Sequence, residues 1–361
     1  MADDTTASKG IVYLIGAGAT HAEVDALGAT RLNLLMQDDE RLGGEGVATG
    51  VLRRLAADGE PFLAGEGLDI EKLISLLVGS GVDSLVSLAD KMRAAYFDEI
   101  KFRLGEAQII DRPDLARGLF EMHQNEGFRE VERLSGVIST NHDGLLQIAS
   151  QEVYGAINLG FPFLSDEFVS DEQAAPLLLQ LHGSFTWRFG VPTRIERLRA
   201  DSEYSRDTVW IPPSILKESK AYPFNKLAAL AYELLARQCD VLRVVGASLT
   251  QNDWNILSLI FNAQRHREIT QGAAFTVELV MPERAGERIR RECSYLRNVV
   301  PIGFLTEGQF DVYKEADDPP PDSDLNNPFA YWLQEKLEHH NGRGEMTALG
   351  PTIGRLLGES V

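Results

Sequence analysis

Four short apolar runs, each followed directly by small or polar residues, constrain the fold of this chain more than any other feature. The runs are Ile11–Ile15, Gly136–Ser139, Leu177–Leu181 and Val241–Val245. The first shows no alternation of apolar and polar residues, which is typical of a strand buried on both faces of a sheet. We therefore expect an α/β, Rossmann-like fold, with a parallel sheet, helices on both of its faces and a helical insertion.

The residues that follow these runs are of the kinds that bind nucleotides. They are Gly16-Ala17-Gly18-Ala19-Thr20, Thr140-Asn141-His142-Asp143, His182-Gly183-Ser184 and Gly246-Ala247-Ser248. In an open parallel α/β sheet, ligands bind outside the carboxyl ends of the strands. The four segments therefore predict one nucleotide site built from distant parts of the chain.

The composition is ordinary for a folded chain, with 44% apolar and 25% charged residues. No run approaches the roughly 20 apolar residues of a membrane-spanning helix, and residues 1–10 lack the regions of a secretion signal. The two cysteines, Cys239 and Cys293, cannot build a disulfide framework or a four-cysteine zinc site. We expect a cytoplasmic protein without a membrane contact.

The net charge of −19 bears on the choice of partner. Phosphate backbones attract basic surfaces, so direct nucleic-acid binding is disfavoured. The basic stretch Arg284–Arg291 is interpreted as a solvated helix face. An acidic surface is compatible with docking onto a basic protein partner.

The distribution of periodic and loop-like segments along the chain predicts one main domain and a tail. Helical periodicity from about 68 to 133 predicts an insertion between the first strand–helix unit and the next strand. Residues near 155–176 and 188–222 are expected to be long loops with little regular structure. The main domain is expected over 10–306, and 307–361 as a linker and helical tail. Phe329–Leu337 can form one apolar-faced helix, which either contacts a partner or packs back on its own core.

The first glycine turn allows a pyrophosphate to approach the start of a helix, where free N–H groups favour anions. A plain tight turn is the alternative. The dehydrogenase fingerprint is incomplete, because His21 stands where a third glycine is usual. Leu32–Gln37 is expected to be a helix, so no second strand carries an acidic residue about twenty residues on. A hydride-transferring Rossmann domain is therefore disfavoured.

Two strand ends carry the side chains best placed for chemistry. Asn141 could aim its amide into the site, whereas Asp143 is expected partly to cap the following helix. His182 lies at another strand end, and an ordinary histidine pKa of about 6.5 allows it to act as a base or a hydrogen-bond donor. Five of the other six histidines have no such context and are interpreted as surface or local residues: His21, His142, His266, His339 and His340.

The chain resembles the SIR2-like (sirtuin-type) NAD-binding domains over about residues 10–305. The resemblance rests on Gly16-Ala17-Gly18-Ala19-Thr20, Thr140-Asn141 with Asp143, His182-Gly183, and Gly246 and Ser248 followed by Asp253. Asp69-Ile70-Glu71, at the head of the insertion, is similar to the bacterial branch found in anti-phage defence systems. The paired Cys-x-x-Cys zinc ribbon and the Gly-Ile-Pro stretch of protein-deacylating sirtuins are absent, and Leu27-Gly28-Ala29-Thr30 stands in the region of the latter.

The resemblance implies an NAD⁺ glycohydrolase that releases nicotinamide and ADP-ribose, or a cyclised form, without a metal. Asn141 would position a water or a ribose hydroxyl, and His182 would act as base or orient the ribose. Asp143 would support Asn141, Gly16–Thr20 would hold the phosphates, and Thr140 would belong to the same site. Gly246, Ser248 and Asp253 would line the adenosine ribose.

The resemblance also implies that the activity is regulated, because an unregulated NADase would deplete the NAD⁺ of its own host cell. A homo-oligomer is expected, together with a partner such as a HerA-type hexameric ATPase or, alternatively, a prokaryotic Argonaute. Three other functions stay open: an NAD-dependent protein deacylase, a non-catalytic NAD or ADP-ribose sensor, and a structural subunit of a larger assembly.

Overall fold

A six-stranded parallel sheet forms the centre of the molecule, as expected from the four apolar runs. The computed structural model describes residues 8–26, 32–38, 44–59, 69–107, 110, 113–124, 129, 132–161, 163–164, 175–190, 194–198, 204–205, 207–213, 220–281 and 283–301. The strand order is β10-β9-β8-β1-β2-β4, and every neighbouring pair is parallel. The strands are β1 (Lys9–Ile15), β2 (Glu132–Ser139), β4 (Leu177–Gln180), β8 (Val241–Val245), β9 (Thr276–Val280) and β10 (Val299–Pro301).

This order places a topological switch point between β1 and β8. The chain proceeds from β1 to β2 and β4 on one side, and then returns to β8, β9 and β10 on the other. Dinucleotide-binding Rossmann folds have the same order, and their ligands lie across the crevice at the switch point. A ligand site is therefore expected at the carboxyl ends of β1 and β8.

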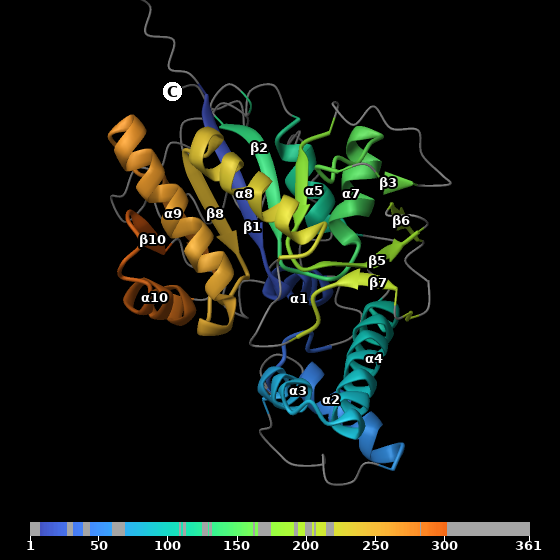
Figure 1. Ribbon diagram of the computed structural model, residues 1–361. Coiled ribbons are helices and arrows are strands. Elements are labelled where there is room, and N and C mark those ends of the chain that lie inside the picture. The colour runs from blue at the N-terminus through green and yellow to red at the C-terminus, as the bar shows by residue number, and fades with distance from the viewer. Residues whose placement is uncertain are drawn as a thin grey trace, which may run out of the picture.

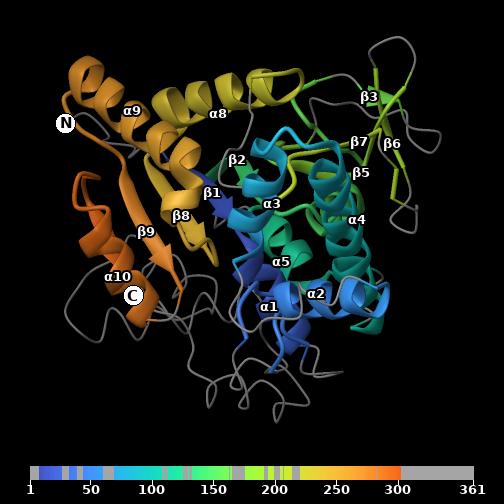
Figure 2. The same ribbon diagram turned by 60° about the horizontal axis from the view of Figure 1, so that its bottom comes forward.

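Helices cover both faces of the sheet, which confirms the predicted α/β fold class (Figures 1 and 2). On one face, α8 (Phe224–Gln238) packs on β1, β2 and β4, and α9 (Trp254–Gln271) lies beside it. Across the sheet from them lie α1 (Ala17–Ala26) and the contacting pair α5 (Asp114–Met122) and α7 (Leu145–Tyr154). Strand β1 is fully apolar and buried from Ile11 to Ile15, because both faces of the sheet are covered.

Helices α2 (Val47–Ala57), α3 (Ile70–Gly79) and α4 (Asp83–Glu106) lie between α1 and α5 in the chain. They form a group beyond the carboxyl end of β1, below the sheet in Figure 1. This group has its own apolar core, which includes Val51, Ile74 and Met92. Arg103 of α4 joins Glu99 at 2.8 Å and donates to the carbonyl oxygens of Glu45 and Gly46, so it ties α4 to the segment before α2.

The prediction of long loops near 155–176 and 188–222 was wrong in part, because both stretches contribute strands to a second, four-stranded sheet of order β3-β6-β5-β7. Its strands are β3 (Phe163–Leu164), β5 (Gly183–Phe189), β6 (Ile195–Arg197) and β7 (Thr208–Trp210). Antiparallel pairing of β5 with β6 and β7 buries Trp187 completely. Strands this short are held by pairing with distant residues, which leaves little periodic signal in the local sequence.

The prediction of a helix at Leu32–Gln37 was also wrong, since residues 32–38 are irregular, with bends at 35–37. The Asn33 side chain donates to Gln37 O at 2.8 Å and to Gly44 O at 3.2 Å, and it accepts from Leu35 N–H at 2.8 Å. Such local bonds from an asparagine compete with helix formation.

Several predictions concern residues outside the described ones. They are the stretch Leu27-Gly28-Ala29-Thr30, the end of the main domain beyond Pro301, the linker and helical tail over 307–361 with the helix at Phe329–Leu337, and His339 and His340. In the described part of the chain, no helix is both long and apolar enough to cross a membrane.

Candidate functional site

The glycine turn after β1 and the loop after β8 are packed against each other at the switch point. Gly16 N–H donates to Val245 O at 3.0 Å, and Gly18 N–H donates to Gly246 O at 2.9 Å. Gly246 has a φ of +62°, and a Cβ on it would lie 2.2 Å from Ala19 N. These glycines are therefore required by the close approach of two backbones, whether or not a ligand binds.

This packing limits how the turn can hold phosphates. Besides the bond from Gly18, the Ala19 N–H donates to Gly16 O at 2.9 Å, so two of the first amides of α1 are already used. Ala17 is exposed at the start of the helix. The predicted phosphate cradle over Gly16–Thr20 thus has fewer free donors than its sequence indicates.

A chain of hydrogen bonds joins the glycine turn to the end of β2. The Asn141 amide nitrogen donates to Gly16 O at 3.1 Å and to Thr20 Oγ1 at 2.8 Å. Thr20 Oγ1 in turn donates to Asp143 Oδ2 at 2.9 Å. Both Asn141 N–H groups are committed in this way, which leaves the amide oxygen as the group that can accept from a ligand or a water.

Asp143 has the capping role that the sequence predicts, and a second one. Its Oδ1 accepts from Leu145 N–H at 3.2 Å at the start of α7, while its Oδ2 accepts from the Thr20 hydroxyl. Burial raises the pKa of Asp143, against the hydrogen bonds from Thr20 and Leu145, which lower it. Gln180 of β4 donates to Asp143 O at 3.0 Å, so the neighbouring strand supports the turn.

His182 follows β4 and lies next to the end of β2, with only 4% of its surface exposed. Its Nδ1 lies 3.2 Å from Thr140 O. A carbonyl oxygen can only accept, so this bond assigns the proton of the neutral ring to Nδ1 and makes Nε2 the basic nitrogen. The backbone of Thr140 thereby orients the ring, while the Thr140 hydroxyl donates to Ile15 O at 3.4 Å.

An aromatic cluster around His142 adjoins His182 and was not predicted from the sequence. The His142 ring lies 6.0 Å from that of His182, and it contacts Phe185 at 5.3 Å and Trp210 at 5.2 Å between ring centres. Tyr96 of α4 stacks on Trp210 at 5.9 Å. Burial raises the pKa of Tyr96, so its phenol stays neutral. The interpretation of His142 as a residue without context was wrong; only the tertiary fold brings α4 and β7 to it.

The residues predicted to line the adenosine ribose are less closely connected to one another than Thr20, Asn141 and Asp143 are. Gly246 contacts the glycine turn, but Ser248 is exposed. The Asp253 carboxylate accepts from Thr250 Oγ1 at 3.3 Å within its own loop, which includes the short helix η3 (Gln251–Asp253). Asn252 of that loop hydrogen-bonds to Glu71 of α3, so the helical insertion contacts the loop that follows β8.

Among the described residues, no group of three or more His, Cys, Asp or Glu side chains could hold a metal ion. Cys239 and Cys293 are both buried free thiols.

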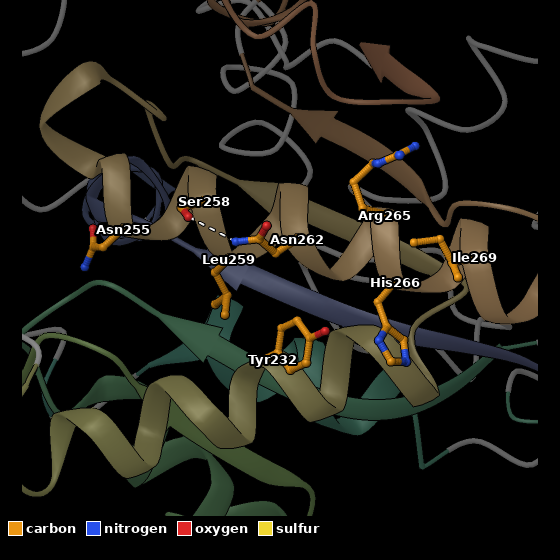
Figure 3. Close-up of a pocket in the computed structure, with 8 residues that line it drawn as sticks. All are labelled: Tyr232, Asn255, Ser258, Leu259, Asn262, Arg265, His266 and Ile269. Atoms are coloured by element: carbon orange, nitrogen blue, oxygen red, sulfur yellow. Dashed lines mark hydrogen bonds between the residues drawn. The ribbon is translucent and has the colours of Figure 1, made fainter.

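The surface groove in Figure 3 is formed by other residues. It measures about 590 Å³ and is lined by Tyr232 of α8 and by one side of α9, from Asn255 to Ile269. None of the predicted site residues borders it. We assign the site from the hydrogen-bonded side chains at the strand ends, because these carry groups that can act on a ligand.

Neither a scan against models of known protein families nor a search of curated proteins found a match to this chain.

Proposed function

We propose that this protein is an NAD⁺ glycohydrolase that cleaves NAD⁺ to nicotinamide and ADP-ribose. One observation carries the proposal: the amide of Asn141 and the ring of His182 lie at adjacent strand ends, each held by hydrogen bonds, at the edge of a sheet with dinucleotide-binding strand order. The order of motifs that resembles SIR2-like domains supports the same function.

The chemistry needs few catalytic groups. When the bond from the ribose carbon to nicotinamide breaks, its electron pair neutralises the cationic ring, so the leaving group needs no general acid. The ribose passes through an oxocarbenium-like state. A water then attacks the anomeric carbon, and its proton goes to His182 Nε2. The Asn141 oxygen accepts the water's other hydrogen and orients it.

The surrounding contacts suit such a site because they hold both groups still. Thr20 and Gly16 fix the Asn141 amide, and Thr140 O fixes the tautomer of His182. The rings of Tyr96, Phe185 and Trp210 pack on one another and on His142, which lies beside His182, and an apolar wall of this kind would help to exclude bulk water.

We further propose that the enzyme is a cytoplasmic effector of bacterial anti-phage defence, of the abortive-infection kind. It would act as a homo-oligomer and be held inactive until it assembles with a partner such as a HerA-type ATPase. The formal charge of −19 is compatible with a basic docking surface on that partner.

A non-catalytic NAD or ADP-ribose sensor is the second candidate. It is favoured by the burial of the polar groups, since Thr20, Asn141 and Asp143 are each at most 8% exposed and bonded to one another. A sensor would bind ADP-ribose without turning NAD⁺ over.

Nicotinamide release by the wild-type chain separates the two candidates, and the variant Asn141→Ala tests the role of Asn141. For the enzyme, we expect this variant to lose nicotinamide release by about a hundredfold or more while still binding ADP-ribose, because it removes the oxygen that orients the water. Nicotinamide is measured by chromatography, ADP-ribose binding by calorimetry, and folding by circular dichroism. Turnover at the wild-type rate would contradict the role of Asn141; binding without turnover in the wild-type chain, with and without its genomic-neighbour protein, would establish the sensor.

A further inference from the structure

We propose that Arg288 binds a phosphate group of the nucleotide, an inference that rests on the function proposed above. Arg288 belongs to α10 (Glu283–Glu292), which follows β9 and lies at the end of the molecule where β1 and β8 end (Figure 1). Its Nη2 lies 3.4 Å from Ser248 O, in the loop after β8. The guanidinium therefore stands beside the loop that packs on the glycine turn.

The guanidinium of Arg288 has N–H donors that are not used within the described part of the protein. Arg288 is half-buried, and its Nε is shielded from solvent without a hydrogen-bond partner. No carboxylate in the described part of the chain forms an ion pair with it. Four other described arginines also hold a shielded Nε. Arg93 and Arg267 are each paired with an aspartate, at 3.0 Å and 2.8 Å, and Arg188 and Arg197 lie on β5 and β6 of the small second sheet rather than beside the loop after β8. A partly desolvated arginine without an anion is a position that an anionic ligand would complete.

A dinucleotide at this edge needs such a cation. The amides of Gly18 and Ala19 are used within the protein, so the glycine turn alone supplies little positive potential to a diphosphate. The buried carboxyl of Asp143 adds none. A guanidinium presents a planar fork of N–H donors that matches two phosphate oxygens, and it remains charged at every relevant pH.

The other arginines of α10 differ from Arg288 and provide controls. Arg284 and Arg291 are exposed, and Arg290 pairs with Glu287 at 2.9 Å. Arg284 lies one helical turn before Arg288 and carries the same charge, so its removal tests whether the net charge of the helix alone matters.

The experiment measures binding of ADP-ribose and of adenosine to the full chain by calorimetry. For Arg288→Ala, we expect ADP-ribose to bind about ten- to a hundredfold more weakly, the usual range for a charge-assisted hydrogen bond. Adenosine, which has no phosphate, should bind equally to the variant and the wild type. Arg284→Ala should bind both ligands within twofold of wild type, and Arg288→Lys should recover part of the ADP-ribose affinity.

Two results would overturn the proposal in different ways. Wild-type affinity of Arg288→Ala for ADP-ribose, or an equal loss for adenosine, would remove Arg288 from phosphate binding and leave the proposed function standing. If the wild-type chain bound neither ligand, the nucleotide site itself would be wrong, and Arg288 with it.

Discussion

Thr20 joins the end of β1 to the end of β2, because its hydroxyl accepts from Asn141 and donates to Asp143. The sequence analysis placed all three residues at strand ends, because each one closely follows an apolar run that predicts a strand. It could not show that they bond to one another, since the contact spans 121 residues. Nor could it find Tyr96 or His142, whose surroundings come from α4 and the small second sheet.

The variant Thr20→Val should therefore be destabilised by about 2–3 kcal/mol, because a buried N–H of Asn141 and an oxygen of Asp143 lose their partner. Thr20→Ser keeps the hydroxyl and loses a methyl group, so it should cost about 1 kcal/mol. Urea unfolding measures both free energies. Equal losses in the two variants would mean that the hydroxyl does not link the strand ends.

His123 makes stability depend on pH. It is buried against Tyr13 OH at 3.0 Å, and its pKa is lowered to about 3, chiefly by burial and then by the charge of Arg243. The folded state therefore stays unprotonated where the unfolded state, with a pKa of about 6.5, takes up a proton. Stability is full above pH 6.5 and falls by about 1.4 kcal/mol per pH unit below it.

This contribution can be isolated with His123→Gln, which keeps an acceptor for Tyr13 and cannot titrate. Between pH 7 and pH 5, the wild type should lose about 2 kcal/mol more free energy of unfolding than the variant. Parallel pH curves for the two proteins would show that His123 is protonated in the fold.

At the scale of elements, strands were easier to predict than their partners. The run Val241–Val245 is strand β8 with the same bounds, although Arg243 lies within it. That arginine is buried because the register puts it beside Tyr13 and Glu278, and because Glu132 accepts two of its N–H groups at 2.9 and 3.0 Å. Strand β5 and its partners were missed since their pairing is not local.

The packing of the β8 loop on α1 predicts a large effect at Gly246. Gly246→Ala should destabilise the fold by about 3 kcal/mol, since a Cβ there meets both an unfavourable φ and the Ala19 nitrogen. Gly155→Ala is the matched control, because Gly155 has a φ of +67° but open space around it. That control should cost about 1–2 kcal/mol in chemical denaturation. Equal losses would mean that the loop and the helix can move apart.

At the scale of the whole molecule, the candidate site is assembled from residues between Gly16 and Arg288 that meet at one end of the sheet. The helical insertion reaches the same end, through Glu71 to Asn252 and through Tyr96 to Trp210. Strand order and the position of the insertion depend on how distant segments pack on the parallel sheet, which no local sequence signal reports. Local sequence signals predict the pieces, and only the fold joins them.

The central claim is that this assembled site hydrolyses NAD⁺, with His182 as the base. The most direct measurement is nicotinamide release from NAD⁺ by the purified chain, alone and with its genomic-neighbour protein, beside His182→Ala. We predict release by the wild type in at least one of these conditions and a loss of about a hundredfold or more in the variant, whose circular dichroism should be unchanged. Equal release by wild type and variant, or no release in either condition, would contradict the account.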